Sequence, residues 1–103
     1  MLEKQVLNWA LAHVVREARE AANLTQVELA DFAGLSKPYI SGLERGNINS
    51  SVFALARIAE VVKVKPNKLM ERVEEEIKKG PKKPEPFTVA MRYRHVTEHA
   101  ARR

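Results

Sequence analysis

The chain has 103 residues, with 18 Lys and Arg against 13 Asp and Glu, so one domain with a net charge of +5 is expected. The absence of cysteine excludes a disulfide scaffold and any cysteine-based metal or redox site. No stretch approaches the roughly 20 apolar residues of a membrane-spanning helix, and the N-terminal segment lacks a basic leader, so we expect a cytoplasmic protein with no membrane partner.

The first predicted helix has apolar residues at intervals of four, three and four, which place them on one face. They are Leu7, Leu11, Val14 and Ala18. We expect this helix to run to about Ala22, with Asn23 as a left-handed stop. A second stripe of the same helix lies roughly opposite, and it predicts a contact with the chain's tail or with a second subunit. Its residues are Leu2, Val6, Trp9 and His13.

The segment from residue 26 to residue 43 predicts two short helices joined by a tight turn. Thr25 and Glu28 have the spacing of a capping box, so a helix should begin at about Gln26. Gly34 falls where the chain must reverse, and glycine adopts the left-handed conformation at little cost. Ser36 then caps the second helix.

The scaffold positions of this segment carry the small and apolar residues that two crossed helices need. They are Leu29, Ala30, Ala33, Leu35, Ile40 and Leu43. Ala30 leaves room for the second helix to cross closely above the first. Helices crossed in this way place the second in the major groove of DNA. The alternative is a helical hairpin with no nucleic-acid partner.

Two more helices follow the motif. Ser50 or Ser51 should cap the first, and Pro66 suits the first turn of the second, which Gly80 and Pro81 end. Five residues are expected to turn the first of these helices toward the core: Val52, Leu55, Ile58, Ala59 and Val62. The prediction is an all-α DNA-binding domain of five helices over residues 1–79, followed by a linker and tail over residues 80–103.

Residues 14 to 70 resemble the Xre-type regulators, a family that includes phage lambda-type repressors, Cro and restriction–modification controller proteins. The resemblance rests on LTQ and ELA within residues 24–30, GLS at 34–36, YISGLERG at 39–46 and LARIAEVVKV at 55–64. It implies a lambda-repressor-like five-helix domain that binds operator DNA as a two-fold homodimer. Two departures stand out: the loop at 47–50 is neither basic nor proline-containing, and Lys65 occupies a position that is usually serine.

In the resembling family, the positions of Arg19 and Glu44 form an ion pair between the first and third helices. Their spacing alone is equally compatible with two solvated charges. If the pair is buried, removal of one partner should cost a few kcal/mol because the other charge is stranded.

The recognition helix is predicted over residues 36–45, and its early outward positions are the candidate base contacts. They are Ser36, Lys37, Pro38, Tyr39, Ser41 and Gly42. Lys37 can donate to guanine O6 or N7, and serine hydroxyls suit either base type. Pro38 and Gly42 offer no side-chain hydrogen bond, so DNA shape or apolar contact with a thymine methyl group should contribute to discrimination.

The candidate phosphate contacts flank the recognition helix on both sides. They are Gln26, Arg45, Asn47, Asn49, Ser50 and Ser51. Gln26 begins a helix, where a side-chain amide and free N–H groups can hold a phosphate. For each candidate contact, the alternative is a surface side chain that binds nothing.

Charge and pattern change in the tail. Residues 1–80 hold 12 Lys and Arg against 11 Asp and Glu, a net of +1, whereas residues 81–103 hold six against two, a net of +4. After the proline-containing linker, apolar residues alternate with others over residues 87–94, which predicts a strand. We favour pairing of this strand with its copy in a homodimer. The alternatives are a partner protein, a contact with DNA or a frayed, solvated tail.

His95, Glu98 and His99 match the H-x-x-E-H pattern of inverted zinc peptidases. The match ends four residues before the last residue, with no downstream third ligand. We therefore predict no catalytic residue, no metal site and no cofactor.

Two classes of function remain. The first is a sequence-specific DNA-binding transcriptional regulator, a repressor that binds a palindromic operator as a homodimer. The second is an antitoxin or protein-interaction module whose tail binds a partner protein. Neither is an enzyme.

Overall fold

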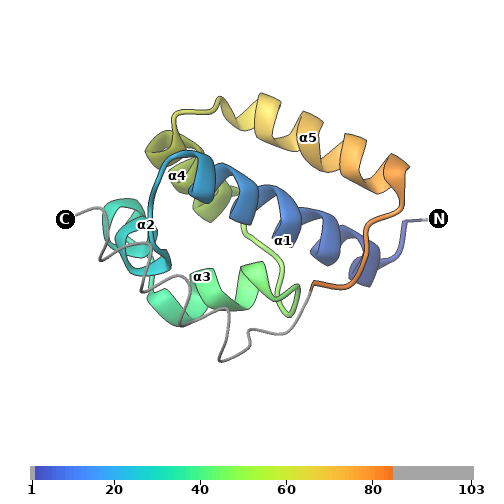
Figure 1. Cartoon of the computed structure of the whole chain (residues 1–103), viewed down its shortest axis with the longest axis horizontal. Coiled ribbons are helices and arrows are strands. Elements are labelled where there is room, and N and C mark those ends of the chain that lie inside the picture. Colours follow the sequence, from blue (N-terminus) through green and yellow to red (C-terminus); the bar gives the residue numbers. More distant parts are fainter. Residues whose placement is uncertain (1, 85–103) are drawn as a thin grey trace.

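A computed structural model describes residues 2–84, which form five helices (Figure 1). The helices are α1 (Lys4–Ala21), α2 (Gln26–Ala33), α3 (Lys37–Glu44), α4 (Val52–Val62) and α5 (Pro66–Lys79). The predicted all-α, lambda-repressor-like fold is confirmed. The predicted strand over residues 87–94 and the His95–His99 pattern lie outside the described residues.

The helix ends follow local chemistry. Asn23 has a φ of 60°, which confirms the predicted left-handed stop after α1. Ser51, rather than Ser50, caps α4, because its Oγ accepts a hydrogen bond from the backbone N–H of Ala54 at 3.0 Å. Lys63 ends α4 with a φ of 60°, a left-handed position that no glycine or asparagine marks. Lys65 precedes α5, and its ammonium group has no acceptor with which to cap a helix.

All five helices enclose the core: α1 packs against α3, α4 and α5, and α2 packs against α3 and α4. Helix α1 runs beside α5 for much of its length (Figure 1). Every helix contributes at least one fully buried large side chain. Among these are Val15, Leu29, Ile40, Leu43, Ile58, Leu69 and Val73. Burial of each such side chain stabilises the fold by about 1.5–3 kcal/mol. Because α2 and α3 both contribute side chains to this core, the core fixes the angle at which they cross.

The prediction that Val52 faces the core is wrong, since this side chain is 87% exposed. The buried face of α4 is defined by Ala54, Ile58, Ala59 and Val62. Val52 lies two residues before Ala54, which is about 200° away around a helix. Its side chain therefore points to solvent at the start of α4.

After α5 the chain turns at Gly80 and runs back across the N-terminal half of α1 toward the end of α3 (Figure 1). We call residues 80–84 the strap. A Cβ placed on Gly46 would lie 2.8 Å from Trp9 Cδ1 and 3.3 Å from Pro84 Cγ, so these three residues meet. Trp9, from the second apolar stripe of α1, is half-buried as a result.

Candidate nucleic-acid interface

The first helix of the motif, α2, is fixed at both ends. At its start, the N–H of Glu28 donates to Thr25 Oγ1 at 3.0 Å, and the N–H of Thr25 donates to Glu28 Oε1 at 2.9 Å. This is the predicted capping box. At its end, Gly34 has a φ of 70° in the predicted left-handed conformation. Arg57 of α4 donates from Nε to the carbonyl of Ala33 at 3.0 Å. This hydrogen bond also fixes the C-terminal end of α2, and the sequence analysis missed it.

The recognition helix, α3, begins with a side-chain cap and an exposed first turn. Ser36 Oγ accepts from the N–H of Tyr39 at 3.2 Å, and Pro38 sits in the first turn, where no intrahelical donor is lost. Ser36, Lys37 and Pro38 are exposed, and Tyr39 is half-buried. These four candidate base contacts therefore share one accessible surface at the N-terminal end of α3.

The two later candidates, Ser41 and Gly42, are not outward positions, and that expectation is wrong. Both are buried, Ser41 to 8% exposure. A Cβ on Gly42 would meet Ile48 Cδ1 at 3.1 Å, so Ile48 from the following loop covers this position. Ser41 Oγ accepts a hydrogen bond from the guanidinium group of Arg45. The isolated apolar residue Ile48 in a polar loop was the sequence signal for this cover.

The candidate phosphate contacts lie on both sides of α3. Gln26, at the start of α2, is half-buried, and the loop between α3 and α4 carries the others. Of these, Arg45, Asn47, Asn49 and Ser51 are exposed, and Ser50 is half-buried. The N–H of Ser51 donates to the Tyr39 hydroxyl at 3.3 Å, which ties the end of this loop to the first turn of α3.

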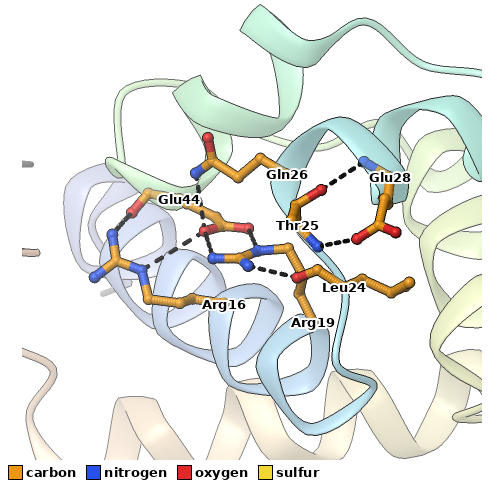
Figure 2. Close-up of polar contacts among 7 residues, drawn as sticks. All are labelled: Arg16, Arg19, Leu24, Thr25, Gln26, Glu28 and Glu44. Carbon is orange, nitrogen blue, oxygen red and sulfur yellow. Dashed lines mark hydrogen bonds and ion pairs between the residues drawn. The ribbon is translucent and has the colours of Figure 1, made fainter. Parts of the chain in front are cut away.

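A polar network centred on Glu44 joins the first three helices (Figure 2). Arg19 donates two hydrogen bonds to the Glu44 carboxylate, from Nε to Oε2 at 2.7 Å and from Nη2 to Oε1 at 2.9 Å. Gln26 Nε2 donates to the same Oε1 at 3.1 Å. Glu44 is 1% exposed and Arg19 is 7% exposed, so this ion pair is buried.

Arg16 is a further member of this network that the sequence analysis missed. Its Nη2 donates to the backbone carbonyl of Glu44 at 3.1 Å, and its Nε lies 3.6 Å from Glu44 Oε1 (Figure 2). The bond to a carbonyl at the end of α3 satisfies an acceptor that the helix itself leaves free. Arg16 lies one helical turn before Arg19 and therefore on the same face of α1.

The remaining surface features of residues 2–84 lie away from α3. This part of the chain contains no group of three or more His, Cys, Asp or Glu arranged to hold a metal ion. An open depression of about 440 Å³ lies at the turn between α4 and α5, where Lys and Glu side chains line most of it. None of the candidate contacts lines this depression. No described helix is long and apolar enough to span a bilayer.

Comparison with solved structures places this arrangement among known regulators. The chain is 27% identical to the clp gene regulator ClgR from C. glutamicum, with a TM-score of 0.64 over 69% of this chain and 91% of that one. It is 29% identical to a mutant of the restriction-modification controller protein C.Esp1396I, with a TM-score of 0.65 over 71% and 92% of the two chains. The controller protein C.AhdI from Aeromonas hydrophila is 31% identical, with a TM-score of 0.54 over 62% and 94%.

Sequence comparison gives the same result. Two uncharacterized HTH-type transcriptional regulators from Mycobacterium tuberculosis, from two strains, are 38% identical over 50 residues. The match covers 48% of this chain and spans about a third of those relatives, 36% of each. The profile of the helix-turn-helix family matches residues 15–69, which includes α2, α3 and α4 in full. The chain therefore belongs to the Xre-like helix-turn-helix family of transcriptional regulators.

Proposed function

We propose that the protein is a repressor that binds a palindromic operator as a homodimer, with α3 in the major groove. The observation that carries this proposal is the exposed first turn of α3, held rigidly between a capped start and a buried ion pair. Helix–turn–helix proteins read base edges with the N-terminal residues of this helix. Repression follows simply from occupancy, because a dimer bound over a promoter excludes the polymerase sterically.

Direct base readout is assigned to the four accessible residues of that turn. Lys37 donates to guanine O6 or N7, and Ser36 accepts from or donates to either base type. Pro38 and Tyr39 present apolar surface to a thymine methyl group. Ser41 and Gly42 are left out of this set, since one is buried with its hydroxyl bonded to Arg45 and the other lies under Ile48.

Phosphate contacts on the two sides of α3 would set its register in the groove. Gln26 is held by Glu44 through Nε2, so its amide is oriented before DNA arrives, and the start of α2 adds its helix dipole. The loop residues supply the other side. They are Arg45, Asn47, Asn49, Ser50 and Ser51.

Two observations support a dimer: α3 is short, and apolar residues are exposed close to it. One helix of eight residues, α3, covers one half-site, and palindromic operators match the two-fold symmetry of a dimer. At the start of α4, Val52 is 87% exposed and Phe53 is 72% exposed. Both follow the loop that flanks α3, and they offer apolar surface to a second copy.

Selection of binding sites from a random duplex library tests this function. The expected result is enrichment of a two-fold symmetric sequence, bound by two chains per duplex. Lys37→Ala should then weaken binding to the selected operator more than binding to random DNA. Lys63→Ala, a change of an exposed lysine at the end of α4, is the matched control and should affect neither. Absence of an enriched sequence would overturn the proposal, and equal losses on both DNAs would make Lys37 a phosphate contact.

A further inference from the structure

Ser41 of α3 and Arg45, the residue that directly follows this helix, lie one helical turn apart and are joined through their side chains. Ser41 Oγ accepts a hydrogen bond from Arg45 Nη1, and the backbone N–H of Arg45 donates to the Ser41 carbonyl at 3.0 Å. Ser41 is buried, whereas Arg45 is exposed. The arginine side chain therefore folds back along α3 instead of extending into solvent beyond the end of the helix.

The partner of Arg45 leaves its positive charge uncompensated. Arg16 and Arg19 are paired with the Glu44 carboxylate, at 3.6 and 2.7 Å. Arg45 is bonded to a neutral hydroxyl instead, and within residues 2–84 it forms no ion pair. A guanidinium group has five N–H donors, so four of them remain for another acceptor. The serine thus fixes the position of this cation without neutralising it.

The candidate phosphate contact on the other side of α3 is held in a complementary way. Gln26 is neutral, and its Nε2 donates to the charged Glu44 carboxylate at 3.1 Å. Glu44 and Ser41 both belong to the buried residues of α3. The recognition helix therefore holds one candidate phosphate ligand on each of its flanks with a buried side chain of its own.

We propose that Ser41 is a positioning residue for DNA binding, which holds the Arg45 guanidinium group beside α3 so that it binds a backbone phosphate. The inference rests on the proposed DNA binding, and it gives a part in that binding to a buried residue that is not among the assigned DNA contacts. A free arginine side chain loses conformational entropy when it binds. Because Arg45 is already ordered, this cost, a factor of about 2–10 in affinity, is reduced.

A double-mutant cycle on the operator selected from the random library tests this role. Affinity is measured by fluorescence anisotropy, and each loss is given per bound chain. Arg45→Ala should weaken binding by about 10-fold or more, since a charge-assisted contact is lost. Ser41→Ala should weaken it by about 3-fold to 10-fold. In the Arg45→Ala background, Ser41→Ala should change affinity by less than about 1.5-fold, because the group that it positions is gone.

The matched control cycle pairs Ser41 with Lys37, which is exposed at the start of the same helix and is not bonded to Ser41. In the Lys37→Ala background, Ser41→Ala should still cost its full factor, because Arg45 is intact. Alanine is favoured over serine inside a helix, so Ser41→Ala is expected to fold. Urea denaturation checks that every variant is folded under the conditions of the binding assay.

The salt dependence of binding separates the position of Arg45 from its charge. Arg45→Ala should flatten the slope of log K against log salt by about 0.9 for each bound chain, because one phosphate contact is lost. Ser41→Ala should leave this slope within about 0.3 of that of the unmodified protein, because Arg45 keeps its charge and still reaches the phosphate.

Neutral methylphosphonate groups, placed one at a time in the operator backbone, locate the contact. One such substitution in each half-site should weaken binding by the unmodified protein but not by Arg45→Ala. For Ser41→Ala, the effect of that same substitution should be smaller, and the effects at other positions should be unchanged. A general disturbance of α3 would not be confined to a single phosphate.

Two results would overturn the inference. Equal losses from Ser41→Ala with and without Arg45 would show that the serine acts on the helix as a whole. Unchanged or tighter binding by Ser41→Ala would show that the hydroxyl does not prepare Arg45 for DNA. If the unmodified protein binds its operator and either result is found, only the role of Ser41 fails. If the library yields no enriched sequence, the proposed function fails together with it.

Discussion

Arg19 and Glu44 lie 25 positions apart in the sequence and form a buried, bidentate ion pair, with nitrogen–oxygen distances of 2.7 and 2.9 Å. Removal of one partner leaves an uncompensated charge in the core. Glu44→Ala should therefore lower the free energy of unfolding by about 3 kcal/mol, measured by urea denaturation. The double change Arg19→Met with Glu44→Leu should recover part of this loss, because no charge is then stranded.

The matched control for this pair is Lys68→Ala, which breaks an exposed pair with Glu71 at 3.1 Å. Exposed pairs contribute little, and the expected loss is below about 0.5 kcal/mol. A melting temperature of Glu44→Ala equal to that of the unmodified protein would show that the network does not stabilise the fold.

Two left-handed positions should respond in opposite directions. Gly34 has a φ of 70°, and a Cβ there would lie 3.3 Å from Arg57 Nη2, so Gly34→Ala should cost about 1–2 kcal/mol. Lys63 has a φ of 60° after α4 and carries a side chain where glycine is preferred. Lys63→Gly should raise the free energy of unfolding by about 0.5–1 kcal/mol. Thermal and urea denaturation measure both effects, and changes of the same sign would contradict this account.

Gly46 should be sensitive for a reason that Gly80 does not share. Both have positive φ, 74° and 79°, but a Cβ on Gly46 would lie 2.8 Å from Trp9, whereas a Cβ on Gly80 would have open space around it. Trp9 is the single tryptophan of the chain, so its fluorescence reports this contact directly. Gly46→Ala should shift the Trp9 emission and destabilise the fold by more than about 1 kcal/mol.

Gly80→Ala provides the comparison, since it carries the conformational cost without the collision. Its Trp9 emission should match that of the unmodified protein. An unshifted emission in Gly46→Ala would mean that Trp9, Gly46 and the strap do not meet in solution.

Gly42 and Ile48 should be energetically coupled. Alanine is favoured over glycine inside a helix by about 1 kcal/mol, but the added Cβ would lie 3.1 Å from Ile48 Cδ1. Ile48→Val removes that atom. The double change should be more stable than the sum of the single changes by about 0.5 kcal/mol or more, as measured in a double-mutant cycle. Additive effects would indicate that Ile48 does not rest on α3.

The parts of this structure that local chemistry determines are those that the sequence predicts well. The capping box of Thr25 and Glu28 and the left-handed turns at Asn23 and Gly34 depend on neighbours within a few residues. The bounds of α2 follow from them, and the resemblance to the Xre-type family supplied the pairing of Arg19 with Glu44.

Contacts between distant segments were not predictable in the same way. The bond from Arg57 to the Ala33 carbonyl joins residues 24 positions apart, and no periodicity marks it. Burial of Gly42 depends on how the loop carrying Ile48 folds over α3. The exposure of Val52 depends on which face of α4 meets the core, and one apolar residue at a helix end does not define that face.

In the proposed DNA complex, the cover that Ile48 places on Gly42 would limit the DNA sequences that this protein can select. With the middle of α3 closed, base contacts in that complex would come from one helical turn at its start. A logo of selected operators should therefore show a few strongly constrained base pairs in each half-site, next to tolerant ones. A genome contains many matches to so few constrained base pairs. Occupancy of an operator by the protein in the cell would therefore depend on the spacing of paired half-sites.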